Sequence, residues 1–170
     1  MQRASTRLFL ALWPGPAARH SLLAWRDACI WPASTALVRP ERLHMTLHFL
    51  GSVASDRLAE LEHGLKVPFK RFDMRLGNCE RWRHGLVVLR PHAVPEPLLE
   101  LQAALAVALS ALSLPLERGA FRPHVTLARR AAGAVLPATA PDFHWSVRGY
   151  VLACSMPGPQ GGYRALARYD

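Results

Sequence analysis

The residues best suited to chemistry stand in a His-x-Thr-Leu tetrapeptide that occurs twice in the sequence. The first copy is residues 44–47 and the second is residues 124–127, and each histidine follows an arginine by two positions, Arg42 or Arg122. A single histidine on a strand is more often a core or surface residue than part of a site. Two copies of one tetrapeptide, both set in alternating apolar sequence, indicate a shared functional role.

The alternating pattern around each motif predicts a strand, in which residues two apart share one face. His44 and Thr46 therefore point the same way, and the apolar residues on either side of them, Phe49 included, point into a core. His124 and Thr126 repeat the arrangement. If the two strands meet at a groove, two imidazoles and two hydroxyls converge there, as hydrolysis of a cyclic phosphate requires. One imidazole takes a proton from water, the other protonates the departing ribose oxygen, and hydroxyls and arginines hold the phosphate oxygens.

A zinc site is the main chemical alternative, since His44, His48 and His124 could supply three imidazoles. Strict alternation places His48 on the face of His44, so it is also a candidate for the edge of the groove. Neither motif strand carries Asp or Glu on that face, however, and H-E-x-x-H and H-x-H are absent. The sequence also lacks G-x-S-x-G, a P-loop and a Gly-rich dinucleotide turn. We therefore expect a site that uses no metal and no other cofactor.

The elements that must position these side chains alternate along the chain. Hydrophobic periodicity and turn residues predict strands at 7–13, 35–39, 42–50, 69–76, 85–90, 124–129, 143–155 and 163–169, and helices at 17–30, 55–65 and 97–112. This order predicts an α+β fold of mostly antiparallel sheets covered by helices. The repeated motif predicts two structural repeats that place the motif strands as symmetry mates.

The composition is that of a folded protein that stays in solution. A length of 170 residues corresponds to one domain or to two small lobes with a common core. Apolar residues make up 51% of the chain, yet the longest apolar runs fall short of the roughly 20 residues that span a membrane. Three cysteines without a C-x-x-C pair argue against a disulfide framework or a zinc ribbon. We expect a cytoplasmic protein.

The formal charge of +9 comes almost entirely from arginine. Of the 21 Lys and Arg residues, only Lys66 and Lys70 are lysines. Arginine binds phosphate through a planar fork, and a chain of this charge attracts polyanions. A preference for arginine also follows from the base composition of a genome. Charge alone therefore raises the possibility of a nucleic-acid or phosphate ligand without deciding it.

Taken together, the motifs resemble those of the 2H phosphoesterase superfamily, and within it the RNA 2′,3′-cyclic phosphodiesterases, also called 2′-5′ RNA ligases. The resemblance covers nearly the whole chain: LHMTLHFLG at 43–51 and FRPHVTLAR at 121–129 are similar to the two family motifs, RLFLALWP at 7–14 to the opening strand, and 143–163 to the last hairpin. It implies two pseudosymmetric lobes with mostly antiparallel sheets around a central cleft that carries both H-x-T-x motifs. Residues 1–170 would then form a single domain of two interleaved lobes, and the protein would be a monomer.

The resemblance also implies roles for the motif residues. The family opens a terminal 2′,3′-cyclic phosphate of RNA, or of a cyclic nucleotide, and leaves a 2′-phosphate without using a metal. His44 would be the proton donor to the 3′ oxygen, and His124 would be the proton acceptor that activates water. Thr46 and Thr126 would bind phosphate oxygens.

An arginine five residues after the second histidine of the family matches Arg129. Ideal alternation instead puts Ala128 and Arg130 on the face of His124. We choose Arg129 as the phosphate-binding arginine because the motif match is direct and strand ends often bulge. Arg130 is the reserve candidate.

Two other functions fit the same motif residues. The histidines could act on a different phosphodiester, such as 2′-5′ linkages or tRNA-splicing ends, or could catalyse ligation by the reverse reaction. A function of another class is that of a non-catalytic protein that binds RNA ends. The presence of both histidines argues against that last function.

Overall fold

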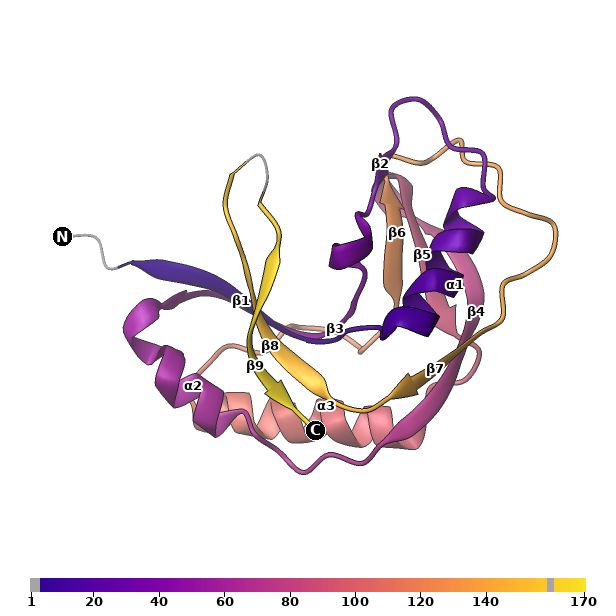
Figure 1. Ribbon diagram of the computed structural model, residues 1–170. Helices are drawn as coiled ribbons and strands as arrows, with labels where there is room; N and C mark the ends of the chain where they lie inside the picture. Colours follow the sequence, from indigo (N-terminus) through magenta and orange to yellow (C-terminus); the bar gives the residue numbers. More distant parts are fainter. Residues whose placement is uncertain (1–3, 159–160) are drawn as a thin grey trace.

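Strands dominate the computed structural model, which describes residues 4–158 and 161–170 of the chain (Figure 1). The strands are β1 (Ser5–Leu12), β2 (Ala36–Leu37), β3 (Met45–Ala54), β4 (Phe72–Trp82), β5 (Leu86–Pro91), β6 (Val125–Arg129), β7 (Phe143–Val147), β8 (Tyr150–Ser155) and β9 (Tyr163–Tyr169). The helices are α1 (Pro16–Asp27), α2 (Leu58–Gly64) and α3 (Glu96–Ala111), with 3-10 turns η1 (Pro40–Arg42), η2 (Ser55–Arg57) and η3 (Arg83–Gly85). The α+β class is confirmed.

The strands join into one curled sheet that has two similar halves. Its order is β7-β4-β5-β6-β3-β1-β8-β9, with the short β2 paired to β6, and the neighbouring strands run antiparallel. In one half β1 leads through α1 to the motif strand β3, and in the other β5 leads through α3 to the motif strand β6. The two motif strands are neighbours at the centre of the sheet. The predicted pseudosymmetry is therefore present, with the motifs at its axis.

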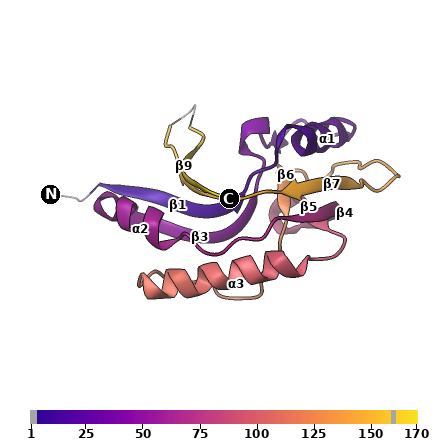
Figure 2. The ribbon, with the colours of Figure 1, turned by 60° about the horizontal axis from the view of Figure 1, so that its bottom comes forward.

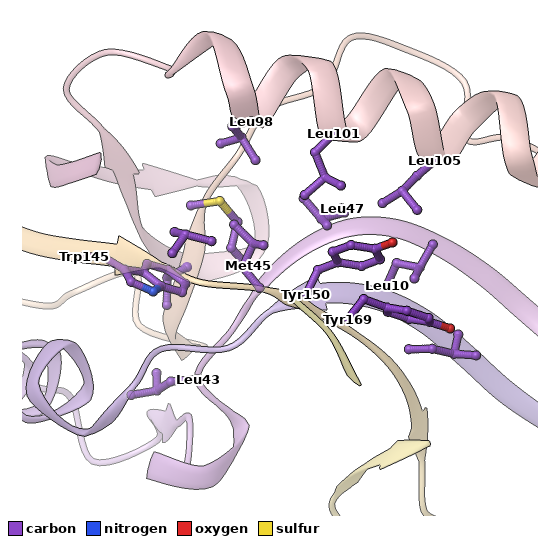
Figure 3. Packing of buried hydrophobic residues seen from close by; sticks show 14 of the residues in the cluster. Leu10, Leu43, Met45, Leu47, Leu98, Leu101, Leu105, Trp145, Tyr150 and Tyr169 are labelled. Carbon is purple, nitrogen blue, oxygen red and sulfur yellow. The ribbon is translucent and has the colours of Figure 1, made fainter. Parts of the chain in front are cut away.

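In each half, the helix that connects the first strand to the motif strand packs against the other half of the sheet. Helix α1 packs beside β7, whereas α3 runs beneath β3 (Figure 2). Leu98, Leu101 and Leu105 recur at helical spacing on α3, are buried, and point toward Leu47 of β3 and Leu10 of β1 (Figure 3). Full burial of each such leucine stabilises the fold by about 1.5–3 kcal/mol. Helix α3 thus packs against the part of the sheet that carries the first motif.

The prediction of one strand over 143–155 is wrong. Strand β7 ends at Val147 and pairs with β4, whereas β8 starts at Tyr150 and pairs with β1 and β9 in the other half of the sheet. At Gly149 between them, a Cβ atom would lie 2.3 Å from the carbonyl oxygen of Tyr169, so only glycine allows this close backbone approach. The apolar pattern continues through the break and therefore could not reveal it.

Other predicted elements differ in extent as well. The strand predicted at 35–39 is reduced to the two residues of β2, and β4 continues well past Leu76, where the sequence pattern ends, to Trp82. Among the described residues, no helix combines the length and the apolar character that crossing a membrane requires.

Candidate active site

A cleft of about 400 Å³ lies over the junction of the two motif strands. His44, Thr46, His124, Thr126 and Arg129 all line it. Residues 36–39 and 42, from β2 and η1, form one wall, and the β8–β9 hairpin stands on the other side of the junction (Figure 1). The structure therefore brings together the two motif histidines, the two threonines and Arg129.

The register of the two motif strands explains this convergence. Met45 pairs with Val125, and each of these two residues directly follows the histidine of its motif. In the antiparallel register, His44 then stands opposite Thr126, and Thr46 stands opposite His124. The two strands do not face each other across a groove. Instead they lie side by side, so that each histidine neighbours the threonine of the other motif on one face of the sheet.

Beyond the threonine, each motif strand contains a β-bulge at its leucine. In β3, His48 and Thr46 pair with the consecutive residues Leu10 and Ala11 of β1, so Leu47 is the extra residue. In β6, Ala128 and Thr126 pair with the consecutive residues 87 and 88 of β5, which makes residue 127 the extra one. A bulge puts two successive residues on the same side and reverses the alternation after it.

The bulge in β6 places Arg129, and not Arg130, in the lining of the cleft. Ala128 is buried against Val87, and Arg129 faces the cleft that His124 lines. Arg130 lies past the end of the strand, has a positive φ of 54°, and is not part of the lining. The position of Arg129 is therefore the one that the motif match predicted and that ideal alternation did not.

The bulge in β3 shows that two expectations for the first motif were wrong. His48 does not lie at the edge of the cleft: it is only 4% exposed, and its Nε2 lies 2.8 Å from the carbonyl oxygen of Gln102 in α3. Phe49, expected in the core, is 46% exposed and lines the cleft. Both residues follow Leu47, and the reversed alternation exchanges their faces.

The three imidazoles of the zinc alternative do not share a site, because His48 turns toward α3 while His44 and His124 line the cleft. Within residues 4–158 and 161–170, no three His, Cys, Asp or Glu side chains are grouped so that they could hold a metal ion.

Both motif histidines are oriented by the same backbone contact. Nδ1 of His44 lies 2.6 Å from the carbonyl oxygen of Arg42, and Nδ1 of His124 lies 2.7 Å from that of Arg122. A carbonyl oxygen can only accept, so Nδ1 carries the hydrogen in each ring. Nε2 is left as the atom that exchanges a proton with a ligand. In the first motif, Nε2 also lies 3.1 Å from Oγ1 of Thr46.

An aromatic cage surrounds His44. The centroid of its ring lies 5.1 Å from that of Phe9 and 5.1 Å from that of Tyr163, which meets it edge-on. The guanidinium of Arg42 lies 5.5 Å from the centre of the Tyr163 ring. Tyr163 could not be recognised as a site residue from the sequence, because it comes from β9, far along the chain, and no local pattern links it to the motif.

A charged network surrounds His124 instead. The Trp82 ring lies 4.5 Å from the imidazole, and the guanidinium of Arg122 stacks 4.3 Å from the centre of the Trp82 ring. The carboxylate of Glu80 accepts hydrogen bonds from Nε1 of Trp82 at 2.5 Å, from Arg90 at 3.1 Å and from Arg122 at 3.4 Å. Glu80 thus holds the indole and both guanidinium groups in place around the second histidine. The hydrogen bond from Trp82 is the largest of several effects that lower the pKa of Glu80.

Burial lowers the pKa of both motif imidazoles below 6.5. For His44, the hydrogen bond to the Arg42 carbonyl opposes burial, while the charges of His124 and Arg129 add to it. For His124, the positive charge of Arg122 lowers the pKa further, and the carboxylate of Glu80 raises it. Both rings are therefore mainly neutral at pH 7 before a ligand binds. An anion bound between them would raise both pKa values, because it stabilises the imidazolium form.

Comparison with known proteins places this site in a family. The family model described as the 2′-5′ RNA ligase superfamily matches residues 16–152. The chain belongs to this superfamily. Its sequence is 30% identical over 145 residues to the RNA 2′,3′-cyclic phosphodiesterase of Escherichia coli strain K12, an alignment that covers 82% of this chain and 80% of that one.

Solved structures of similar proteins share the whole fold. Escherichia coli LigT complexed with 3′-AMP superimposes with a TM-score of 0.86 at 25% identity, covering 97% of each chain. A protein of Thermus thermophilus superimposes with a TM-score of 0.78 at 26% identity, covering 95% of this chain and 96% of the other. The resemblance to RNA 2′,3′-cyclic phosphodiesterases is therefore confirmed at the level of family and fold, and the superfamily is one of phosphoesterases.

Proposed function

We propose that the protein hydrolyses the terminal 2′,3′-cyclic phosphate of RNA to a 2′-phosphomonoester. The observation that carries the proposal is the pair of imidazoles in one cleft, each tied by Nδ1 to a backbone carbonyl and each left with Nε2 for proton transfer. General acid–base catalysis needs one group that takes a proton and one that gives it. The name of the Escherichia coli relative, an RNA 2′,3′-cyclic phosphodiesterase, supports this choice of substrate.

The cyclic phosphate would lie between the two motifs, with its non-bridging oxygens held by Thr46, Thr126 and Arg129. The hydroxyl of Thr126 makes no hydrogen bond to any described residue and is free to donate to an oxygen of the substrate. The guanidinium of Arg129 can pair with two oxygens at once. These donors would stabilise the additional negative charge that the phosphate carries in the transition state.

In the proposed reaction, His124 is the proton acceptor and His44 the proton donor. Nε2 of His124 takes a proton from water as the water oxygen bonds to phosphorus. The bond between phosphorus and the 3′ oxygen breaks, and Nε2–H of His44 protonates that oxygen. The 2′-phosphate and a free 3′ hydroxyl remain, and a proton passes from His124 back to His44 through solvent.

The surroundings of the two rings are consistent with this division of roles. Burial lowers the pKa of His124, and the cations Arg122 and Arg90 lower it further, which keeps its Nε2 ready to accept a proton. His44 must be protonated to act as the donor. We expect the bound anionic phosphate to supply that condition by raising the pKa of His44.

The description of the matched family favours ligation as a second candidate function. If a 5′ hydroxyl replaces water, His124 would take its proton and the attack on phosphorus would expel the same 3′ oxygen. The product would be a 2′-5′ linkage. The two reactions therefore share every catalytic group and differ only in the nucleophile that enters the cleft.

The test is product analysis with an oligonucleotide that ends in a 2′,3′-cyclic phosphate. We expect a 2′-phosphate as the product, identified by phosphorus NMR, and the same rate after treatment with a chelator. A 3′-phosphate product would contradict the assignment of His44 as donor to the 3′ oxygen. Binding without turnover would instead identify a protein that only recognises RNA ends. Inactivation by EDTA that zinc or manganese reverses would show metal catalysis.

A further inference from the structure

A second cavity, of about 420 Å³, lies next to the cleft. The two share no lining residue, but Trp13 connects them. Trp13 lines the second cavity, and its ring centroid lies 6.4 Å from that of His44 and 6.5 Å from that of Tyr163, which belong to the cleft. A chain that leaves the cleft past Trp13 therefore enters this cavity.

Three arginines line the second cavity: Arg71, Arg148 and Arg168. All three are exposed, and none forms an ion pair with a described residue. Asp170 contributes the single acidic side chain of the described lining. A further cavity of about 220 Å³ shares Arg71 and Arg148 and also contains Asp73 in its lining. Three cations gathered without partners favour an anionic ligand with several charges.

The fold brings these arginines together from distant parts of the sequence. Arg71 precedes β4 and Arg148 follows β7, and these strands pair through Phe72 and Val147. Arg168 of β9 pairs with Val151 of β8, which packs on the same face of the sheet as Phe9 of the cleft cage. Arg168 therefore lies on the face of the sheet that carries the active site.

A third cavity, of about 270 Å³, borders the cleft on another side and is less suited to a polyanion. Its Arg122 is paired with Glu80, and its Glu117 lies 3.5 Å from the backbone nitrogen of Phe49. An RNA that ends in a cyclic phosphate leaves the cleft in one direction only, toward its 5′ side. Among the described residues, the third cavity has one arginine without an ion pair, Arg118 beside Glu117, whereas the exit past Trp13 has three.

We propose that the cavity around Arg71, Arg148 and Arg168 binds the backbone phosphates of the RNA nucleotides that precede the cyclic end. Trp13 offers an aromatic surface on which a base of the connecting nucleotide stacks, since every base has a face that packs on an indole. This inference rests on the proposed function, because it takes an RNA end as the ligand of the cleft. It adds a substrate preference: RNA longer than a mononucleotide binds more tightly.

The test compares a triple variant, Arg71→Gln, Arg148→Gln and Arg168→Gln, with a matched control, Arg7→Gln, Arg83→Gln and Arg164→Gln. The control arginines are also exposed and unpaired among the described residues, and they line none of the four cavities. Each protein is assayed with a 2′,3′-cyclic mononucleotide and with an oligonucleotide carrying the same end. Binding is measured by fluorescence anisotropy with an oligonucleotide that ends in a non-cyclic 3′-phosphate. This measurement needs no turnover.

For the cavity variant, KM and Kd for the oligonucleotide should rise about tenfold, the scale of a few exposed ion pairs. The slope of log Kd against log salt concentration should become shallower by about 2, because each lost phosphate contact removes roughly 0.7 on a single strand. The mononucleotide should show no change. Equal effects in the cavity variant and the control, or an equal loss with the mononucleotide, would overturn the inference. Absence of hydrolysis by the wild type would contradict the proposed function, while the anisotropy comparison would still decide the role of the cavity.

Discussion

The two halves of the molecule position their motifs in the same way but surround them with different chemistry. In both halves the histidine donates Nδ1–H to the carbonyl two residues before it, the guanidinium of that residue packs on an aromatic ring, and a bulge follows the threonine. The same five-residue step from the histidine then ends at Phe49 in one half and at Arg129 in the other, and both line the cleft. The backbone repeats, whereas the side chain at the equivalent position changes.

The side chains around the two histidines differ as well. Phe9 and Tyr163 pack around His44 with rings that suit a ribose or a base. His124 instead has the Trp82 ring and the network centred on Glu80 beside it, whereas Arg129 lies toward His44, whose pKa its charge lowers. A duplicated scaffold thus places two imidazoles in one cleft, and different side chains surround each of them.

The largest expected effect is the loss of either histidine. We expect His44→Ala and His124→Ala each to reduce kcat by about 100- to 10,000-fold, the usual contribution of one positioned acid or base. The thermal midpoint should stay close to that of the wild type, because both side chains line an open cleft. His48→Ala is the informative contrast, since it should lower the thermal midpoint through the lost contact with Gln102 while leaving kcat nearly unchanged. A near-normal rate in either motif variant would show that the two halves do not share the catalysis.

The next effect concerns the position at which the halves differ. Arg129→Lys should lower kcat/KM by about 10- to 100-fold, because lysine keeps the charge but cannot pair with two phosphate oxygens through a planar fork. Arg130→Lys should change it little, since Arg130 lies outside the cleft. The reverse result would mean that the bulge in β6 is absent in solution and that ideal alternation orders the strand. Steady-state kinetics on a cyclic mononucleotide measures both variants without contributions from a longer RNA.

The two β-bulges limit how much of the site could be predicted from the sequence. The class of the fold, the motif strands and the convergence of His44, Thr46, His124 and Thr126 follow from alternation and from the repeat. Everything after the motif leucines depends on one extra residue per strand, which periodicity does not reveal, so His48 and Phe49 were placed on the wrong faces. Arg129 was placed in the cleft only because the family motif carries the effect of the bulge within it.

Contacts between segments that are far apart in the sequence are a second limit on what could be predicted from it. Tyr163, Trp82 and Glu80 reach the histidines through strand pairing that is not evident in local sequence. The break at Gly149 is hidden for a similar reason, because the closeness of the Tyr169 carbonyl is a tertiary contact. Local patterns therefore predicted that the two motif histidines share a cleft, but not the surroundings that distinguish them.

The pH dependence should show the lowered pKa values of both histidines. Activity of the free enzyme needs His124 neutral and His44 protonated, so kcat/KM should follow a bell whose optimum lies below about 6.5. The anionic substrate raises both pKa values, so the optimum of kcat should lie at higher pH than that of kcat/KM. A kcat/KM optimum above the ordinary histidine pKa would show that burial does not control these groups.

The smallest effect, and the sharpest comparison of the halves, comes from Glu80→Gln. Burial lowers the pKa of His124 and the carboxylate of Glu80 partly opposes it, so removal of that carboxylate should move the acidic limb of the kcat/KM profile to lower pH. We expect a loss in kcat of about two- to fivefold from looser placement of Arg122 and Trp82, as for other charge networks near the surface. Glu41→Gln is the matched control, because this exposed acid stands next to Arg42 in the half that has no such network. A purely structural role for Glu80 predicts a lower thermal midpoint with an unshifted pH profile. A shifted limb in Glu80→Gln and an unchanged one in Glu41→Gln would show that the charge difference between the halves sets the basicity of His124.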